Sequence, residues 1–141
     1  MKSREKKKST REFTLYDFIK GILRRAFRKF PFYAKTLNAA KEEYFIPSKE
    51  GKPMRRVHYR CAHCKQFFNS KDVCVDHIDP VISTISGRTD YNDLVSRMFT
   101  DKLQVLCNYK GIRAGKRSCH YDKTQAEKIE LLESKKSLQK K

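Results

Sequence analysis

The sequence predicts a small α+β domain preceded by a helical segment. Residues 14–30 carry apolar side chains at helical spacing, and the last segment, from Ser118 to about Leu138, is also expected to be helical. Residues 57–60 and 73–77 instead alternate as strands do. Because the chain has 141 residues, 38% hydrophobic, we expect one modest core. A core of this size often needs a further stabilising element such as a bound metal.

The chain begins with a basic tail that leads into a first helix. The charged and small residues at the start predict disorder over residues 1–13. Thr14 can cap a helix, with Asp17 three residues later, and Pro31 ends the pattern. The apolar positions expected to face the core are Leu15, Phe18, Ile19, Ile22, Ala26 and Phe30.

A second helix is expected after Pro31. Leu37, Ala40 and Tyr44 would share one face of it, and Pro47 signals its end. These two helices make residues 14–54 an N-terminal helical segment.

The rest of the chain divides into a central domain and a tail. Residues 48–53 form a turn that opens onto a short strand, and we assign residues 55–126 to the central domain. Within it, residues 87–101 are expected to form a loop with one short helix. Residues 127–141 form the charged, fraying end of the last helix and a basic tail.

The charge balance predicts a polyanionic partner. Lys and Arg number 33 against 16 Asp and Glu, which gives a formal net charge of +17. Such a balance usually indicates nucleic acid, although a basic ribosome-associated protein would show it too. Lys20, Arg24 and Arg28 form a basic stripe on the first helix, and the stretch from Lys110 to Arg117 is also basic.

The same composition predicts an intracellular protein. No run approaches the ~20 apolar residues that a membrane span needs. No apolar stretch follows the basic start, as it would in a signal peptide. We therefore expect a cytoplasmic protein with reduced thiols and no membrane partner. Five cysteines in that setting favour metal binding over disulfides.

Four of the five cysteines predict a zinc site. Cys61 and Cys64 have the spacing of a knuckle that binds one ion, although one such pair is only moderately specific. Cys107 and Cys119 can complete a tetrahedral set because the Gly- and Lys/Arg-rich stretch between them can loop out. Cys74 is left over, and its place in an alternating strand indicates a buried, small apolar residue.

Two further places carry candidate catalytic residues. Asp76 and His77 stand together at the end of an apolar strand, where a carboxylate can bind Mg²⁺ and an imidazole can accept a proton. Neighbouring strand residues face opposite sides, so both reach one phosphate only if the backbone bends there. His120 follows a predicted zinc ligand directly, in the first turn of the last helix.

The order of these motifs resembles the HNH endonuclease family, in particular its small free-standing bacteriophage members. The motifs are CxxC, VDHIDP, LQVLC and CHYDKT, and the resemblance covers about residues 55–126. It implies a ββα-metal core: a hairpin that carries Asp76 and His77, and a helix that carries His120. For a bacteriophage protein, the cytoplasm would be that of the host.

The resemblance also implies a role for each motif. Asp76 and His120 would bind a catalytic Mg²⁺ or Mn²⁺, and His77 would be the general base. The structural zinc ligands would be Cys61, Cys64, Cys107 and Cys119.

Two features depart from the family pattern. The family has Asn just before LQ, whereas this chain has Lys102, and either Asn92 or Asn108 could take its place. The family also spaces its last two cysteines closely. Here the separation suggests an inserted basic finger, Lys110 to Arg117, that can touch DNA.

Together these observations predict a metal-dependent DNA endonuclease. The alternative is a non-catalytic zinc-binding module for nucleic acid. In either case DNA is the expected partner, with a homodimer or phage packaging proteins as further possibilities. The residues expected to contact it are Lys20, Arg24, Arg28, Lys110, Arg113, Lys116, Arg117 and Lys123.

Overall fold

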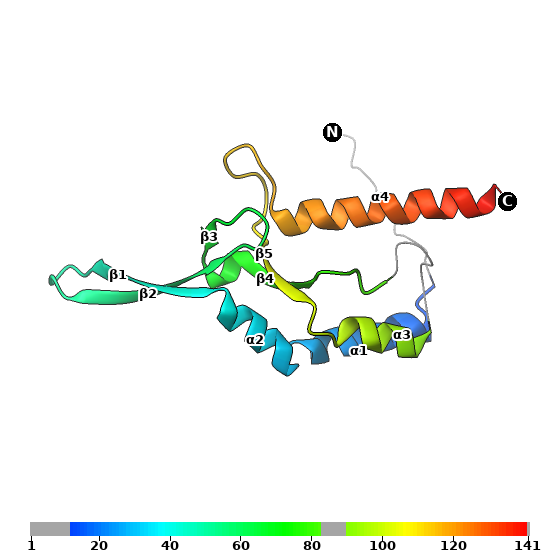
Figure 1. The fold of residues 1–141 in the computed structure, drawn as a ribbon, viewed down its shortest axis with the longest axis horizontal. Coiled ribbons are helices and arrows are strands. Elements are labelled where there is room, and N and C mark those ends of the chain that lie inside the picture. Colours follow the sequence, from blue (N-terminus) through cyan, green and yellow to red (C-terminus); the bar gives the residue numbers. More distant parts are fainter. Residues whose placement is uncertain (1–11, 83–89, 141) are drawn as a thin grey trace, which may run out of the picture.

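A computed structural model describes residues 12–82 and 90–140 (Figure 1). Within these ranges the fold is mixed α+β, with four α-helices and two small antiparallel sheets. The tail predicted for residues 1–13 lies almost wholly outside the described residues, as does the start of the predicted loop 87–101. None of the helices in the described part is both long and apolar enough to cross a bilayer.

The elements follow one another in a mixed order. The helices are α1 (Leu15–Phe27), α2 (Pro31–Ala39), α3 (Tyr91–Met98) and α4 (Cys119–Gln139), with a short 3-10 turn at Ser70–Asp72. The strands are β1 (Lys41–Pro47), β2 (Pro53–Arg60), β3 (Phe67–Phe68), β4 (Val73–His77) and β5 (Leu103–Cys107).

Helix α1 begins as predicted but buries a different face. The Thr14 hydroxyl accepts a hydrogen bond from the Asp17 amide at 3.2 Å, which caps the helix. Phe27 is its buried residue, whereas four of the residues expected in the core are exposed: Leu15, Phe18, Ile22 and Ala26. The sequence carries a second apolar set, Tyr16, Leu23 and Phe27, at the same spacing. Packing against α3, which stacks Tyr16 on Tyr91, selects that set.

The second helix is shorter than predicted, and the prediction that Tyr44 belongs to it is wrong. Pro31 opens α2 at its first turn, where a missing amide costs nothing, and the helix ends at Ala39. Tyr44 lies on strand β1, which pairs in antiparallel register with β2. Gly51, at φ +76°, allows the turn that joins the two strands. The resulting hairpin projects from the rest of the molecule (Figure 1).

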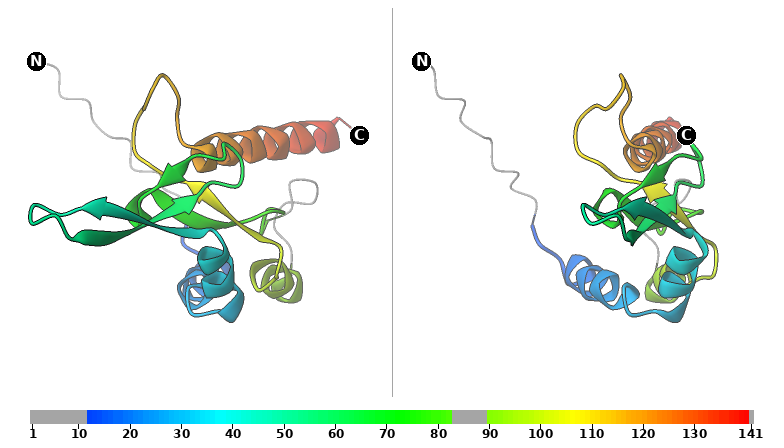
Figure 2. Two further views of the ribbon diagram at one scale, coloured as in Figure 1. Left: turned by 60° about the vertical axis from the view of Figure 1, so that its left-hand side comes forward. Right: turned by 90° about the vertical axis from the view of Figure 1, so that its left-hand side faces the viewer.

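A second sheet, β4–β5, holds the centre of the fold. Its register pairs Val75 with Val105 and Asp76 with Gln104. Helices α1, α2 and α3 lie on one side of this sheet and α4 on the other (Figure 2). The α4 prediction is confirmed: Ser118 caps the helix by accepting from the Tyr121 amide at 3.3 Å. The short helix expected within residues 87–101 is α3.

Two buried clusters hold these layers together. The larger one, on the side of α1 and α3, contains Phe27, Val75, Leu94, Met98, Leu103 and Val105. Complete burial of a side chain such as Leu94 contributes about 1.5–3 kcal/mol. The smaller cluster contains Cys61, Leu106 and Cys107. The β4–β5 sheet thus has an apolar core at one face and a cysteine-rich cluster at one end.

Candidate metal centre and adjoining cavity

Four cysteines from separate parts of the chain meet at one point. Cys61 and Cys64 follow β2, Cys107 ends β5 and Cys119 begins α4. Their sulfur atoms all lie within 4.8 Å of one another. Four thiolates at ~2.3 Å from a single Zn²⁺ would stand roughly 3.8 Å apart. The cluster is therefore positioned to bind one metal ion, as the spacing predicted.

Backbone hydrogen bonds shape the knuckle that presents the first two thiols. The Cys61 amide donates to the Gln66 carbonyl at 2.9 Å, and the Lys65 amide donates back to the Cys61 carbonyl at 3.0 Å. Lys65 takes a positive φ of 63° to close this turn. The Ala62 amide donates to the Val105 carbonyl on β5 at 2.8 Å. The knuckle is thereby fixed to the central sheet.

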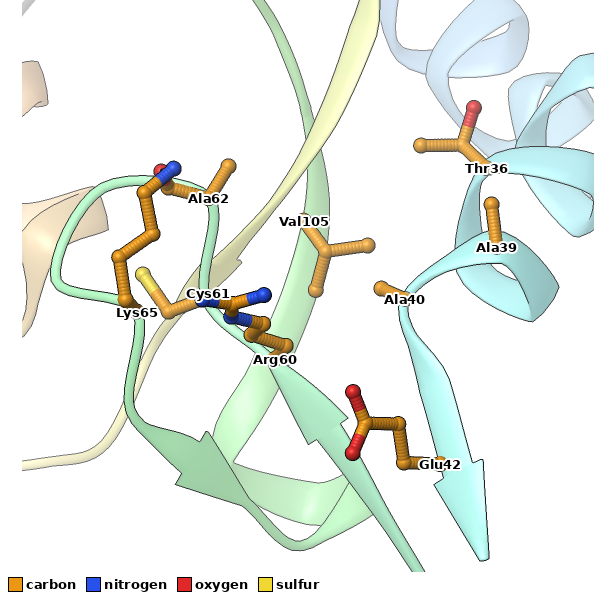
Figure 3. Close-up of a pocket in the computed structure, with 9 residues that line it drawn as sticks. All are labelled: Thr36, Ala39, Ala40, Glu42, Arg60, Cys61, Ala62, Lys65 and Val105. Atoms are coloured by element: carbon orange, nitrogen blue, oxygen red, sulfur yellow. The ribbon is translucent and has the colours of Figure 1, made fainter.

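A shallow hollow of about 360 Å³ lies behind the knuckle (Figure 3). Thr36 and Ala39 of α2 line one side of it, and Cys61 and Lys65 line the other. The Lys65 ammonium group is turned back onto the Ala62 carbonyl.

The thiols of the cluster differ in how readily they ionise. Burial raises the pKa of Cys107 to about 11, and burial together with a hydrogen bond to Cys107 raises the pKa of Cys119 further. Burial also opposes ionisation of Cys61, but hydrogen bonds from the Cys64, Cys107 and His63 amides outweigh it and lower its pKa. Binding a cation to all four as thiolates must therefore displace protons.

His77, at the end of β4, is held through one of its ring nitrogens and through its ring face. Its Nε2 lies 2.8 Å from the Met98 carbonyl oxygen, and its ring stacks on Phe27 with centroids 4.6 Å apart. A carbonyl can only accept, so Nε2 carries the proton. Nδ1 is then the nitrogen with a lone pair, which suits a base.

Asp76 faces the opposite side of β4 and meets α4. Its Oδ1 lies 3.9 Å from His120 Nε2, and its Oδ2 lies 2.9 Å from Lys123 Nζ. Oδ2 is buried, and the Lys123 contact is an ion pair without the alignment of a hydrogen bond. Two bonds of about 2.1 Å to one Mg²⁺ span up to about 4.2 Å, so Asp76 and His120 can share an ion. The span of this pair is compatible with a shared divalent cation, although the Lys123 ammonium group already lies beside Oδ2.

Lys123 is placed at this carboxylate rather than in open solvent. It bridges Asp76 and Glu127. Burial disfavours its charged form, but the hydrogen bond to Glu127 and the negative charges of Asp76 and Glu127 outweigh burial and raise the pKa of Lys123. Lys123 therefore stays cationic and neutralises Asp76.

Asp76, His77 and His120 all line one cavity of about 650 Å³. The cavity surrounds the end of β4 between α1 and α4, and Asp76 and His77 line it from opposite faces of that strand. Arg24 and Arg28 of α1 line the same cavity, as do Lys123 and Lys128 of α4. Cations from two helices thus flank the three candidate catalytic residues.

The other residues predicted to touch DNA have different surroundings. Lys20 pairs with Asp17 at 3.4 Å and is not among the residues that line this cavity. Arg113 is held by Asp72 at 3.0 Å and lies over the Tyr109 ring, 4.6 Å from its centroid. Lys110 and Arg117 line a second cavity, beside α4.

The predicted basic finger is a small ordered hairpin. Arg113 and Lys116 exchange two backbone hydrogen bonds, of 2.9 and 3.0 Å. The residues between them, Ala114 and Gly115, both have positive φ, 47° and 75°. Positive φ at both central positions describes a type I′ turn. The finger stands away from the sheets in Figure 1.

Sequence reasoning missed the two residues that orient His77. Phe27 and Met98 belong to the core, and only the three-dimensional packing brings them to the imidazole. Lys102 stands where the resemblance implies Asn. It contacts the residue after His77 through its backbone, because its carbonyl oxygen accepts a hydrogen bond from the Ile78 amide at 3.0 Å. Asn108 lines the second cavity, and Asn92 lies on α3.

The spare cysteine is close to these centres but joins neither set of ligands. Cys74 is half-buried on β4 and lines the large cavity. Burial, and then the charge of Asp76, raise the pKa of Cys74 to about 12. The prediction of a small apolar residue at this position agrees with a thiol that stays neutral.

Comparison with known proteins gives this chain no relative: no family model, no curated protein and no solved structure matches it.

Proposed function

We propose that this protein is a metal-dependent DNA endonuclease of the HNH type. The observation that carries the proposal is the convergence of Asp76, His77 and His120 on one cavity whose walls hold Arg24 and Arg28. The two arginines supply charge for phosphates, and guanidinium groups suit phosphate oxygens. The overall charge of +17 supports a nucleic-acid substrate.

In the proposed mechanism, His77 is the general base. The Met98 carbonyl fixes the proton on Nε2, so Nδ1 takes the proton from the attacking water. Phe27 holds the ring plane, which limits the orientations that the base can adopt. Such a positioned base contributes roughly 10²–10⁴ in rate.

Asp76 and His120 would hold a Mg²⁺ or Mn²⁺ ion at the scissile phosphate. When bound, such an ion supplies Lewis-acid stabilisation of the charge that develops on the phosphate. Lys123 orients Asp76 from the side of Glu127. One such site hydrolyses one strand in each event, so a single protein molecule is expected to nick duplex DNA.

We assign the four-cysteine cluster to structural zinc. All four positions of a tetrahedral ion would be filled by Cys61, Cys64, Cys107 and Cys119, with no open position for chemistry. Since His120 follows Cys119 directly, the zinc would fix the first turn of α4 and with it the position of His120.

One observation favours a second candidate function, a zinc-binding nucleic-acid module without catalysis. Asp76 already has a cationic partner in Lys123, 2.9 Å away. A carboxylate neutralised in this way needs no metal ion. The cavity and its arginines would then hold a phosphate backbone without cutting it.

Nicking of supercoiled plasmid separates the two functions. We expect relaxed product with Mg²⁺ or Mn²⁺ from the wild type, and none from His77→Ala or His120→Ala. His58→Ala is the matched control, because His58 stacks between Tyr44 and Phe67 on the first sheet, outside the cavity. If the wild type binds DNA and zinc but leaves the plasmid supercoiled with either ion, the protein is the binding module.

A further inference from the structure

Helix α4 separates two cavities. His120, Thr124 and Lys128, four residues apart, line both of them. Lys123 and Glu127 line the large cavity with Asp76 and His77 and do not line the second one. Tyr121 and Gln125 point only into the second cavity. The stripe from His120 to Lys128 is therefore a ridge that the two cavities share.

The second cavity, of about 400 Å³, lies between this ridge and the basic finger. Lys110, Gly111 and Arg117 line it from the finger, and Asn108 lines it from the end of β5. Its volume falls within the range of small-molecule sites, ~300–1,000 Å³, near the lower limit. A single nucleotide is a ligand of suitable size.

The side chains around this cavity suit the parts of a nucleotide. Lys110 and Lys128 supply positive charge for a phosphate. The Arg117 guanidinium lies 4.4 Å from the centre of the Tyr121 ring, and both aromatic rings and guanidinium planes stack on bases. The amides of Asn108 and Gln125 each offer donors and an acceptor, which can read a base edge.

We propose that the second cavity binds the nucleotide next to the scissile phosphate, with its base unpaired and lying against Arg117 and Tyr121. This inference rests on the proposed function, because the large cavity must hold the scissile phosphate. The DNA strand then crosses α4 at His120, from one cavity into the other. A base inside the second cavity cannot stay in the duplex, so DNA whose adjacent base is mismatched or unpaired is the preferred substrate.

The test compares labelled duplexes that differ at one position. After the cut is mapped on a perfect duplex, a mismatch is placed beside the scissile phosphate or five nucleotides away. We expect the adjacent mismatch to raise kcat/KM about tenfold, because the enzyme no longer has to unpair that base. The distant mismatch changes kcat/KM less than twofold. Equal rates on these two substrates would overturn the proposal.

Variants at Tyr121 test whether the pocket reads the base. Tyr121→Leu removes the aromatic ring and should abolish the tenfold preference, whereas Tyr121→Phe keeps the ring and should retain it. Gln125→Ala should reduce discrimination among the four bases at that position. A Tyr121→Leu variant that kept both its fold and the full preference would contradict the pocket.

A binding measurement keeps the test separate from catalysis. Anisotropy with Ca²⁺ in place of Mg²⁺ compares a duplex that carries one bulged nucleotide with the perfect duplex. We expect tighter binding of the bulged duplex by the wild type and Tyr121→Phe, and not by Tyr121→Leu. If the wild type cuts no DNA, the proposed endonuclease fails, and the anisotropy comparison still decides whether an unpaired base is bound.

Discussion

The two ends of the β4–β5 sheet differ: one carries a buried cluster of cysteines, and the other opens onto a cavity. Helix α4 contributes a residue to each. At one end Cys61 and Cys107 are buried and four sulfur atoms face one another within 4.8 Å. At the other end Asp76 and His77 line a cavity of about 650 Å³. Cys119 and His120, adjacent in the first turn of α4, belong to one centre each. The four-cysteine cluster and the cavity are thus joined through two adjacent residues of α4.

The largest effect is expected from removing a ligand of the four-cysteine cluster. Both the cluster and the cavity at the other end of the β4–β5 sheet should then lose their structure. Cys107→Ser removes one of four ligands, so we expect zinc loss and a melting temperature lower by about 10 °C or more. Thermal unfolding and metal analysis measure these changes. Cys74→Ser is the matched control, since Cys74 is outside the cluster. Equal melting temperatures for both variants would rule out a structural metal.

A substitution in the cavity that Asp76 and His77 line should leave the four-cysteine cluster intact. His77→Ala should lower kcat for DNA cleavage by about 10²–10⁴ while zinc content and DNA affinity stay near those of the wild type. Single-turnover cleavage and anisotropy on the same duplex separate the two quantities. A loss of zinc in this variant would mean that the two ends do not act independently.

A smaller effect is expected from the cavity walls. Arg24→Ala or Arg28→Ala should weaken DNA binding several-fold at low salt and reduce the slope of log K against log salt by about one for each phosphate that is no longer neutralised. Lys20→Ala, on the same helix but paired with Asp17 and outside the cavity lining, should change neither quantity. Anisotropy titrations at several salt concentrations make this comparison. Equal effects for all three variants would assign binding to net charge alone.

The smallest effect concerns Cys74, between the two ends. Because the pKa of its thiol is raised from 9.0 to about 12, the unfolded chain ionises at lower pH than the folded one. The neutral Cys74 thiol therefore makes its whole contribution to the free energy of unfolding below pH 9, and this contribution is lost as the pH rises towards 12. The free energy of unfolding of the wild type should therefore fall relative to Cys74→Ala above pH 9. Urea unfolding at several pH values measures this difference, and parallel curves for the two proteins would contradict a thiol that stays neutral in the folded state.

The same contrast explains what could be predicted from the sequence. The cysteine cluster could be predicted, because the spacing of a knuckle is visible in the sequence and four thiolates are the usual ligands of a structural metal ion. The starts of α1 and α4 could also be predicted, because Thr14 and Ser118 cap these helices with their own side chains. Each of these signals lies within a few residues of its effect.

The rest depends on partners distant in the chain. Strand β1 was expected to be helical, and only pairing with β2 makes residues 41–47 extended. The buried face of α1 is selected by α3, since two apolar faces compete in its sequence. His77 is oriented by Phe27 and Met98, which lie about fifty positions before it and about twenty after it. No local pattern carries these choices.

The segment that carries the finger starts and ends at the four-cysteine cluster, at Cys107 and Cys119, and this anchoring has an evolutionary consequence. Its two ends are fixed however long the loop is, and lengthening a loop costs little free energy, about 0.6 kcal/mol for each doubling. The tip, with its type I′ turn at Ala114 and Gly115, can therefore be exchanged or extended while α4 keeps its position. The finger is therefore a site at which new loop sequences can be inserted without rebuilding the rest of the fold.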